Sequence, residues 1–144
     1  MLLGVPKETY PGERRVALAP ETAASLIGVG WDVALEAGAG GPAGLGDDVY
    51  RDKGVEIIAA RAEVFSRADI VLQVRTLGAN PQAGSADIDL LRQGQVLVGL
   101  AEPLSDASPA SRLAAAGASL FALELIPRIT RAQGMDVLSS MATL

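Results

Sequence analysis

The sequence contains no cysteine and no histidine. Without cysteine, disulfide bonds, thiolate chemistry and zinc sites with cysteine ligands are excluded. Without histidine, the chain lacks the commonest general acid–base group and the commonest metal ligand of proteins. Two of the most frequent sources of catalysis and metal binding are therefore absent.

Basic charge and long apolar runs are also scarce. Lys and Arg number 12 against 17 Asp and Glu residues, a net charge of −5, so the basic surface typical of nucleic-acid-binding proteins is missing. No apolar run approaches the roughly 18 residues of a membrane-spanning helix, and the first residues lack the order of a signal peptide. The composition predicts a soluble, cytoplasmic domain that binds no nucleic acid and does not insert directly into a membrane.

Apolar, strand-like runs alternate with helical patterns along the 144 residues. Strands are expected at residues 2–6, 31–38, 55–59, 69–74, 95–100 and 119–125. Helices are expected at residues 20–30, 47–54, 62–68, 86–94 and 108–117, the last with Ser108 as its N-cap and Pro109 in its first turn. Several strands are continuously apolar, as parallel strands covered on both faces are. The alternation predicts a doubly wound parallel α/β sheet in a single domain over residues 1–144.

The stretch GAGGPA, residues 38–43, has the G-x-G-x-x-A form of a dinucleotide-binding loop and follows an expected strand. In that fingerprint a helix opens at the second glycine, so that its N-terminus can meet a pyrophosphate. Here Pro42, Gly44 and Gly46 follow instead, and no helical pattern begins before about Asp47. We therefore interpret the stretch as a glycine-rich surface turn.

Two arginines and one glutamate stand out among the other polar residues. Arg15 follows the first expected strand and Arg75 ends the fourth, and the carboxyl ends of strands are where open α/β sheets bind ligands. The alternative is local ion pairs in a solvated loop, each worth little. For Arg15 the two interpretations are balanced, and for Arg75 the second is favoured. Glu124 lies in an expected apolar strand and needs a partner if it is buried, for which Arg128 is one possibility.

Residues 127–144, named here the closing segment, form a dense polar stretch. Its hydrogen-bonding side chains include Arg128, Gln133, Asp136 and Ser139. On a helix from about residue 130, the last three would share one face, with the arginine at the helix mouth. Arginine and glutamine donate while aspartate and serine accept, which would suit a flat ring that carries an amide. An amphipathic helix whose polar face meets water fits the pattern equally well.

Four motifs in chain order resemble a known family. PRITRAQGMDVLSSMA (127–142) resembles the signature of the NAD(H)-binding alpha subunit of proton-translocating NAD(P) transhydrogenase. GVPKE, GERRVALAPET and VALEAGAG are similar to the N-terminal pattern that this family shares with alanine dehydrogenase. The motif at 127–142 is highly specific, and the likeness covers essentially the whole chain.

The resemblance implies a flavodoxin-like doubly wound sheet that forms the first lobe of a two-lobed protein. A Rossmann lobe would follow in sequence and is absent from this chain, which is then a fragment and inactive alone. NAD(H) would lie between the lobes, with Arg128, Gln133, Asp136 and Ser139 around the nicotinamide. Gln133 would stand where hydride passes to NADP(H) on a partner domain. Gly134 replaces a serine of the family pattern and removes one hydroxyl from that loop.

The same resemblance implies further assembly. Partner domains would bind NADP(H) and span the inner membrane, coupling hydride transfer to proton translocation, while this subunit forms a homodimer peripheral to that membrane. One alternative is an alanine dehydrogenase-like amino-acid dehydrogenase, whose chemistry needs a histidine and a lysine that this chain lacks at the corresponding segments. Imine reduction requires a proton donor, whereas hydride exchange between two nicotinamides does not. Another alternative is a non-catalytic dimerisation or docking domain.

Overall fold

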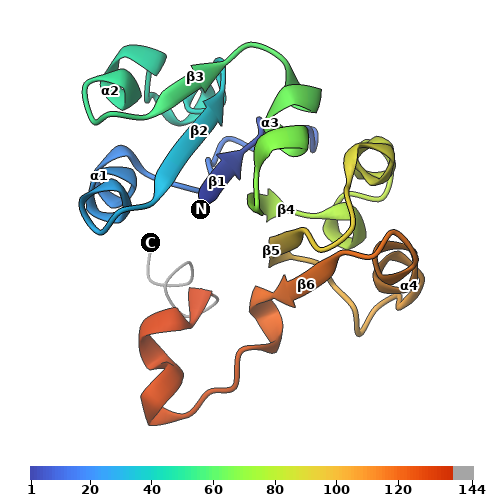
Figure 1. The fold of residues 1–144 in the computed structure, drawn as a ribbon. Coiled ribbons are helices and arrows are strands. Elements are labelled where there is room, and N and C mark those ends of the chain that lie inside the picture. Colours follow the sequence, from blue (N-terminus) through green and yellow to red (C-terminus); the bar gives the residue numbers. More distant parts are fainter. Residues whose placement is uncertain (138–144) are drawn as a thin grey trace.

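The computed structural model describes residues 1–137 as a six-stranded sheet with helices on both faces (Figure 1). The strands are β1 (Leu2–Val5), β2 (Asp32–Glu36), β3 (Glu56–Ile58), β4 (Ile70–Arg75), β5 (Val96–Leu100) and β6 (Ser119–Ala122). The α-helices are α1 (Pro20–Gly28), α2 (Asp47–Arg51), α3 (Arg61–Arg67) and α4 (Ser108–Ala115). Short 3-10 helices are η1 (Gly41–Ala43), η2 (Leu77–Ala79), η3 (Gly84–Leu90), η4 (Leu123–Leu125) and η5 (Thr130–Met135).

The strand order is β3-β2-β1-β4-β5-β6, and every neighbouring pair is parallel. The chain runs outward from β1 to β3, crosses back to β4, and then continues outward to β6. Without the short edge strand β3, this is the 2-1-3-4-5 order of flavodoxin-like sheets. The predicted doubly wound parallel α/β fold is therefore confirmed.

Apolar clusters on both faces hold the helices on the sheet. On one face, α1 and α2 cover the first strands through a cluster that includes Val5, Leu35 and the fully buried Tyr50. On the other face, α3 and α4 contribute Phe65 and Leu113 to a second cluster. Alternate residues of the central strands feed opposite clusters, because successive side chains of a strand point to opposite faces. The loops that follow β1 and β4 lie at the carboxyl edge of the sheet.

Four expected elements differ in detail. The strand expected at 119–125 ends at Ala122, and the helix expected at 86–94 is instead η3. Ser108 is the first residue of α4 rather than its N-cap, and its N–H and hydroxyl donate to the Asp106 carboxylate. The helix expected from about residue 130 is the 3-10 helix η5, which ends at Met135. No helix within residues 1–137 is long and apolar enough to cross a lipid bilayer.

Candidate functional site at the carboxyl ends of β1 and β4

The direction of strand progression reverses between β1 and β4. β1 pairs with β2 along all four of its residues but with β4 only at Leu3 and Gly4. Beyond Gly4 the two central strands separate, and the loop that follows β1 enters the gap. In open α/β sheets this reversal point is where a crevice forms and ligands bind.

Two cavities flank this crevice. The first cavity has a volume of about 310 Å³, and its lining includes Arg15, Gln73, Val74, Leu123 and Val137. The second cavity, of about 340 Å³, is more polar and includes Tyr10, Arg75, Asn80 and Glu102 in its lining. Val137 belongs to the closing segment, so the fold brings that segment against the first cavity.

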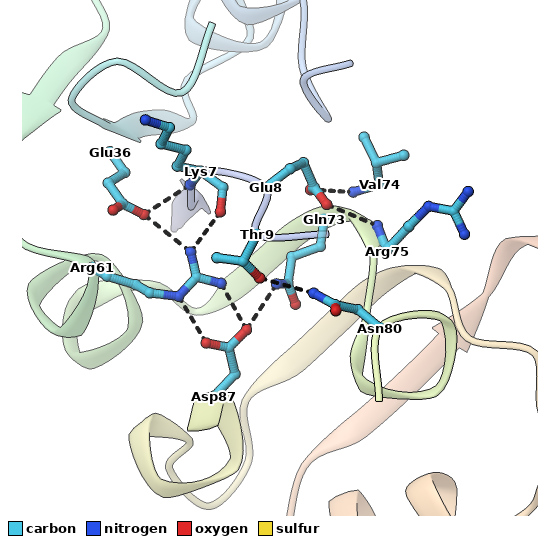
Figure 2. Close-up of polar contacts among 10 residues, drawn as sticks. All are labelled: Lys7, Glu8, Thr9, Glu36, Arg61, Gln73, Val74, Arg75, Asn80 and Asp87. Carbon is cyan, nitrogen blue, oxygen red and sulfur yellow. Dashed lines mark hydrogen bonds and ion pairs between the residues drawn. The ribbon is translucent and has the colours of Figure 1, made fainter. Parts of the chain in front are cut away.

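Glu8 connects the loop after β1 to the end of β4, as Figure 2 shows. One carboxylate oxygen accepts the N–H of Val74 at 2.7 Å, and the other accepts the N–H of Arg75 at 3.2 Å. Burial raises the pKa of Glu8, and the nearby charge of Glu13 raises it further, although the two backbone hydrogen bonds act in the opposite direction. The fold thus buries a carboxylate at the junction between the two cavities.

Glu13 joins the two arginines that the sequence singled out. Arg15 donates through Nε and Nη2 to the two Glu13 oxygens at 2.7 and 2.6 Å, and Arg75 donates through Nε at 3.0 Å. These contacts, the hydrogen bonds from Arg15 first, lower the pKa of Glu13 to about 2. The Arg75 guanidinium also stacks on the Tyr10 ring at 4.3 Å. Both arginines therefore form local ion pairs and at the same time line a cavity.

Arg61, at the start of α3, anchors the same loop from below (Figure 2). Its guanidinium donates to both oxygens of Asp87 at 2.7 Å, to the carbonyl oxygen of Lys7 at 2.6 Å and to Glu36 at 3.1 Å. Asp87 also accepts a hydrogen bond from the buried Gln73 amide. This cluster links α3, η3 and the ends of β1, β2 and β4.

Sequence reasoning did not identify Arg61 and Asp87 as site residues, and it did not assign Glu8 a partner. Asp87 was placed in a helix that did not form, and Arg61 directly preceded an expected helix as one charged residue among many. The contacts of Glu8 with β4 span 66 and 67 residues of sequence, so no local pattern reveals them. The one available signal was the density of charge directly after the first strand.

Of the closing segment, the structure describes residues 127–137. Arg128 and Gln133 are exposed, while Asp136 is half-buried and its N–H donates to the Gln133 carbonyl at 3.2 Å. Ser139 lies outside the described residues. Val137 lines the first cavity, whereas Arg128, Gln133 and Asp136 are not among its lining residues.

Glu124 takes backbone partners rather than Arg128. One of its oxygens accepts the N–H groups of Ala101 and Glu102, and its other oxygen is buried without a hydrogen-bond partner among residues 1–137. Glu102 has a positive φ of 49°, an uncommon conformation for a residue other than glycine. The chain after β6 is therefore held against the end of β5.

The glycine-rich stretch at 38–43 forms a turn, as predicted. It contains η1 and ends in a left-handed Gly44, and the next helix begins only at Asp47. Within residues 1–137 there is no group of three or more acidic side chains that could hold a metal ion. The carboxyl-edge crevice, with its two cavities and the charged groups between them, is the candidate site.

Comparisons with known proteins agree with this architecture. The family described as alanine dehydrogenase/PNT, N-terminal domain, matches residues 4–144. NAD(P) transhydrogenase subunit alpha from Cereibacter sphaeroides is 40% identical over 144 residues, which is 100% of this chain and 26% of that protein. Alanine dehydrogenase from Halomonas elongata is 33% identical over 144 residues, 100% of this chain and 37% of that protein.

A solved structure extends the likeness to three dimensions. The crystal structure of transhydrogenase from Sinorhizobium meliloti superposes with a TM-score of 0.88 and 37% identity, covering 99% of this chain and 40% of that one. This chain therefore spans well under half the length of the relatives that it matches.

Proposed function

Because the chain belongs to the alanine dehydrogenase/PNT N-terminal domain family, we propose that it is the first lobe of the NAD(H)-binding component of a proton-translocating NAD(P) transhydrogenase. The complete enzyme transfers hydride directly between NADH and NADP⁺, which a partner domain binds, and a membrane domain couples the transfer to proton movement. This lobe lies on the cytoplasmic side, peripheral to the inner membrane through its partners, and forms a homodimer.

The observation that carries the proposal is the likeness to a transhydrogenase alpha subunit over all 144 residues, closing segment included. Alanine dehydrogenase matches equally far but at lower identity. The absence of histidine separates the two reactions, because imine reduction needs a proton donor and hydride exchange does not.

The first cavity fits one end of a nicotinamide dinucleotide. A nicotinamide ring is flat and largely apolar with one carboxamide, and the cavity combines aliphatic residues such as Val74 and Val98 with two polar side chains, Arg15 and Gln73. We assign Arg128, Asp136 and Ser139 to the carboxamide, and Gln133 to the point where the two nicotinamides approach. The bound dinucleotide supplies the hydride.

The protein contributes orientation and exclusion of water rather than proton transfer. In this role Arg128 donates to the carboxamide and to Asp136, and the aliphatic lining keeps water from the reacting face. Positioning of this kind lowers a barrier because the reactants lose their freedom on binding instead of during reaction. No described side chain has to act as an acid or a base.

The test uses the complete subunit with its partner domains. Arg128→Ala is expected to weaken NADH binding several-fold in calorimetry, because it removes a charged donor and leaves Asp136 without it. Gln133→Ala is expected to slow hydride transfer in stopped-flow measurements while NADH affinity changes little. Arg131→Ala, an exposed arginine of the same segment, is the matched control and should change neither. Wild-type values in both variants would refute the assigned roles.

The second candidate is an amino-acid dehydrogenase, favoured by the likeness to alanine dehydrogenase over the whole chain. It predicts NAD-dependent oxidation of alanine by the complete subunit, and the transhydrogenase proposal predicts none. If this lobe instead serves only for docking, neither activity will respond to substitutions in the closing segment. Residues 1–144 alone are expected to bind NADH very weakly, because half a cleft cannot enclose a dinucleotide.

A further inference from the structure

Glu8 occupies the gap that opens between the two central strands. β1 stops pairing with β4 after Gly4, and the β4–β5 register shifts between Leu72 and Arg75. The regular backbone hydrogen bonds of β4 to β1 and to β5 are therefore interrupted near the end of β4. The two N–H groups of Val74 and Arg75 go to the Glu8 carboxylate instead.

We propose that Glu8 is a positioning residue whose carboxylate replaces β1 as the neighbour of β4 and fixes the wall between the two cavities. Val74 lines the first cavity and Arg75 lines the second. The Arg75 side chain in turn holds Glu13, which holds Arg15. The Glu8 carboxylate thereby fixes the position of the β4 backbone at Val74 and Arg75, which line the two cavities. This inference stands independently of the function proposed above.

The electrostatics of Glu8 argue against a role in stability alone. The charged groups that act on it are Glu13 and Arg15 from its own loop and Arg61 from α3, while Arg75 of β4 meets it through its backbone N–H. Burial is the largest influence and leaves the pKa of Glu8 above its ordinary value despite the attraction of Arg61. An acid whose pKa is raised by folding stabilises the fold only while protonated, and ionisation at neutral pH costs stability. Glu8 is thus a half-buried carboxylate whose charge is opposed by burial and supported by two backbone hydrogen bonds.

The decisive comparison is Glu8→Gln against wild type at pH 7, with Glu21→Gln on the exposed face of α1 as the matched control. The amide side chain keeps the shape but offers one acceptor oxygen instead of two. We expect the urea midpoint to equal or exceed that of wild type. Hydrogen-exchange protection, followed by NMR, should fall about tenfold at Val74 or Arg75, the equivalent of one hydrogen bond, and stay unchanged at Leu97 in the core.

A second measurement, an NMR pH titration, uses only the wild-type chain and so does not depend on a variant that folds. The amide proton resonance of Val74 in the wild-type chain should titrate with a midpoint above that of an ordinary glutamate, because the carboxylate that accepts its hydrogen bond gains a proton there. Glu13 ionises far below this range. Absence of this titration would overturn the proposal. So would a Glu8→Gln variant in which the urea midpoint and all slow amides decline together, since that is the mark of a structural role.

Discussion

Two arginines of helix α3 provide a direct test of how burial sets the strength of an ion pair. Arg61 and Arg67 each present a guanidinium fork to a carboxylate, with N–O distances of 2.7 to 2.8 Å. The Arg61 fork meets Asp87, and the side chains are 20% and 8% exposed. The Arg67 fork meets Glu56, and the side chains are 40% and 51% exposed. The two forks have similar N–O distances, but Arg61 also donates to Lys7 and Glu36 and is less exposed.

Arg61→Ala is expected to lower the free energy of unfolding by about 3 kcal/mol. Breaking a buried pair by removing one partner costs roughly 3–5 kcal/mol, because the remaining charge is left in a poor solvent. Asp87 would retain only the Gln73 amide among its described donors. The lower end of the range applies because the Arg61 side chain keeps one fifth of its exposure.

Arg67→Ala is expected to change the free energy of unfolding much less, as is usual for exposed pairs. Both substitutions replace arginine by alanine within the same helix, so differences in helix propensity largely cancel. Urea unfolding at pH 7 measures both. If Arg61→Ala fails to fold, Arg61→Lys keeps the charge but loses the fork and gives the comparison.

The reasoning is refuted if the two alanine variants differ by less than about 1 kcal/mol, because burial would then carry no weight. A double variant separates lost attraction from the penalty of an orphaned charge. Adding Asp87→Asn to Arg61→Ala should restore part of the loss, since the neutral amide is cheaper to bury than a lone carboxylate. A further loss on adding Asp87→Asn would contradict this account.

Three further predictions concern other parts of the chain. Glu13→Gln should cost about 1–2 kcal/mol at pH 7 by chemical denaturation: the lowered pKa corresponds to about 3 kcal/mol at most, discounted because Arg15 is 42% exposed. That stability is complete above about pH 4.5 and is lost as pH falls toward 2, so the gap between variant and wild type should narrow in acid. Gly99→Ala places a methyl group against a main-chain carbonyl of β4 and should lower the thermal midpoint, whereas Gly28→Ala, with open space around it, should not. Tyr50→Phe removes a buried hydroxyl that donates to a main-chain carbonyl at 2.8 Å and should cost about 1–2 kcal/mol in urea unfolding.

The sheet was predictable because its strands carry their own signal. Continuous apolar runs separated by helical patterns located all six strands, each beginning within one residue of the expected position. Most of the errors lie after β5. There Glu124 accepts hydrogen bonds from backbone amides more than twenty residues away, and β6 ends before it, at Ala122. A contact between distant residues cannot be inferred from the local apolar pattern, which is the same on either side of Ala122.

The location of the candidate site could be predicted from the sequence, but most of the contacts between its residues could not. The topology of a doubly wound sheet directs attention to the carboxyl ends of its central strands, and Arg15 and Arg75 were identified there from the sequence. Their shared partner was not, because Glu13 lies two residues from Arg15 but 62 residues from Arg75. The role of Glu8 was hidden for the same reason.

The way in which these charges are paired bears on which ligand the crevice prefers. A small carboxylate ligand that sought Arg15 and Arg75 would have to displace Glu13, whose side chain is 6% exposed and already held by both. Binding of such a ligand would replace the charge-assisted hydrogen bonds of Glu13 by similar bonds to the ligand. The ligand would also lose translational and rotational freedom, so the exchange would gain little free energy. A neutral, flat ring that enters the apolar first cavity displaces no such partner. The internal ion pairs therefore count against a small carboxylate ligand between Arg15 and Arg75.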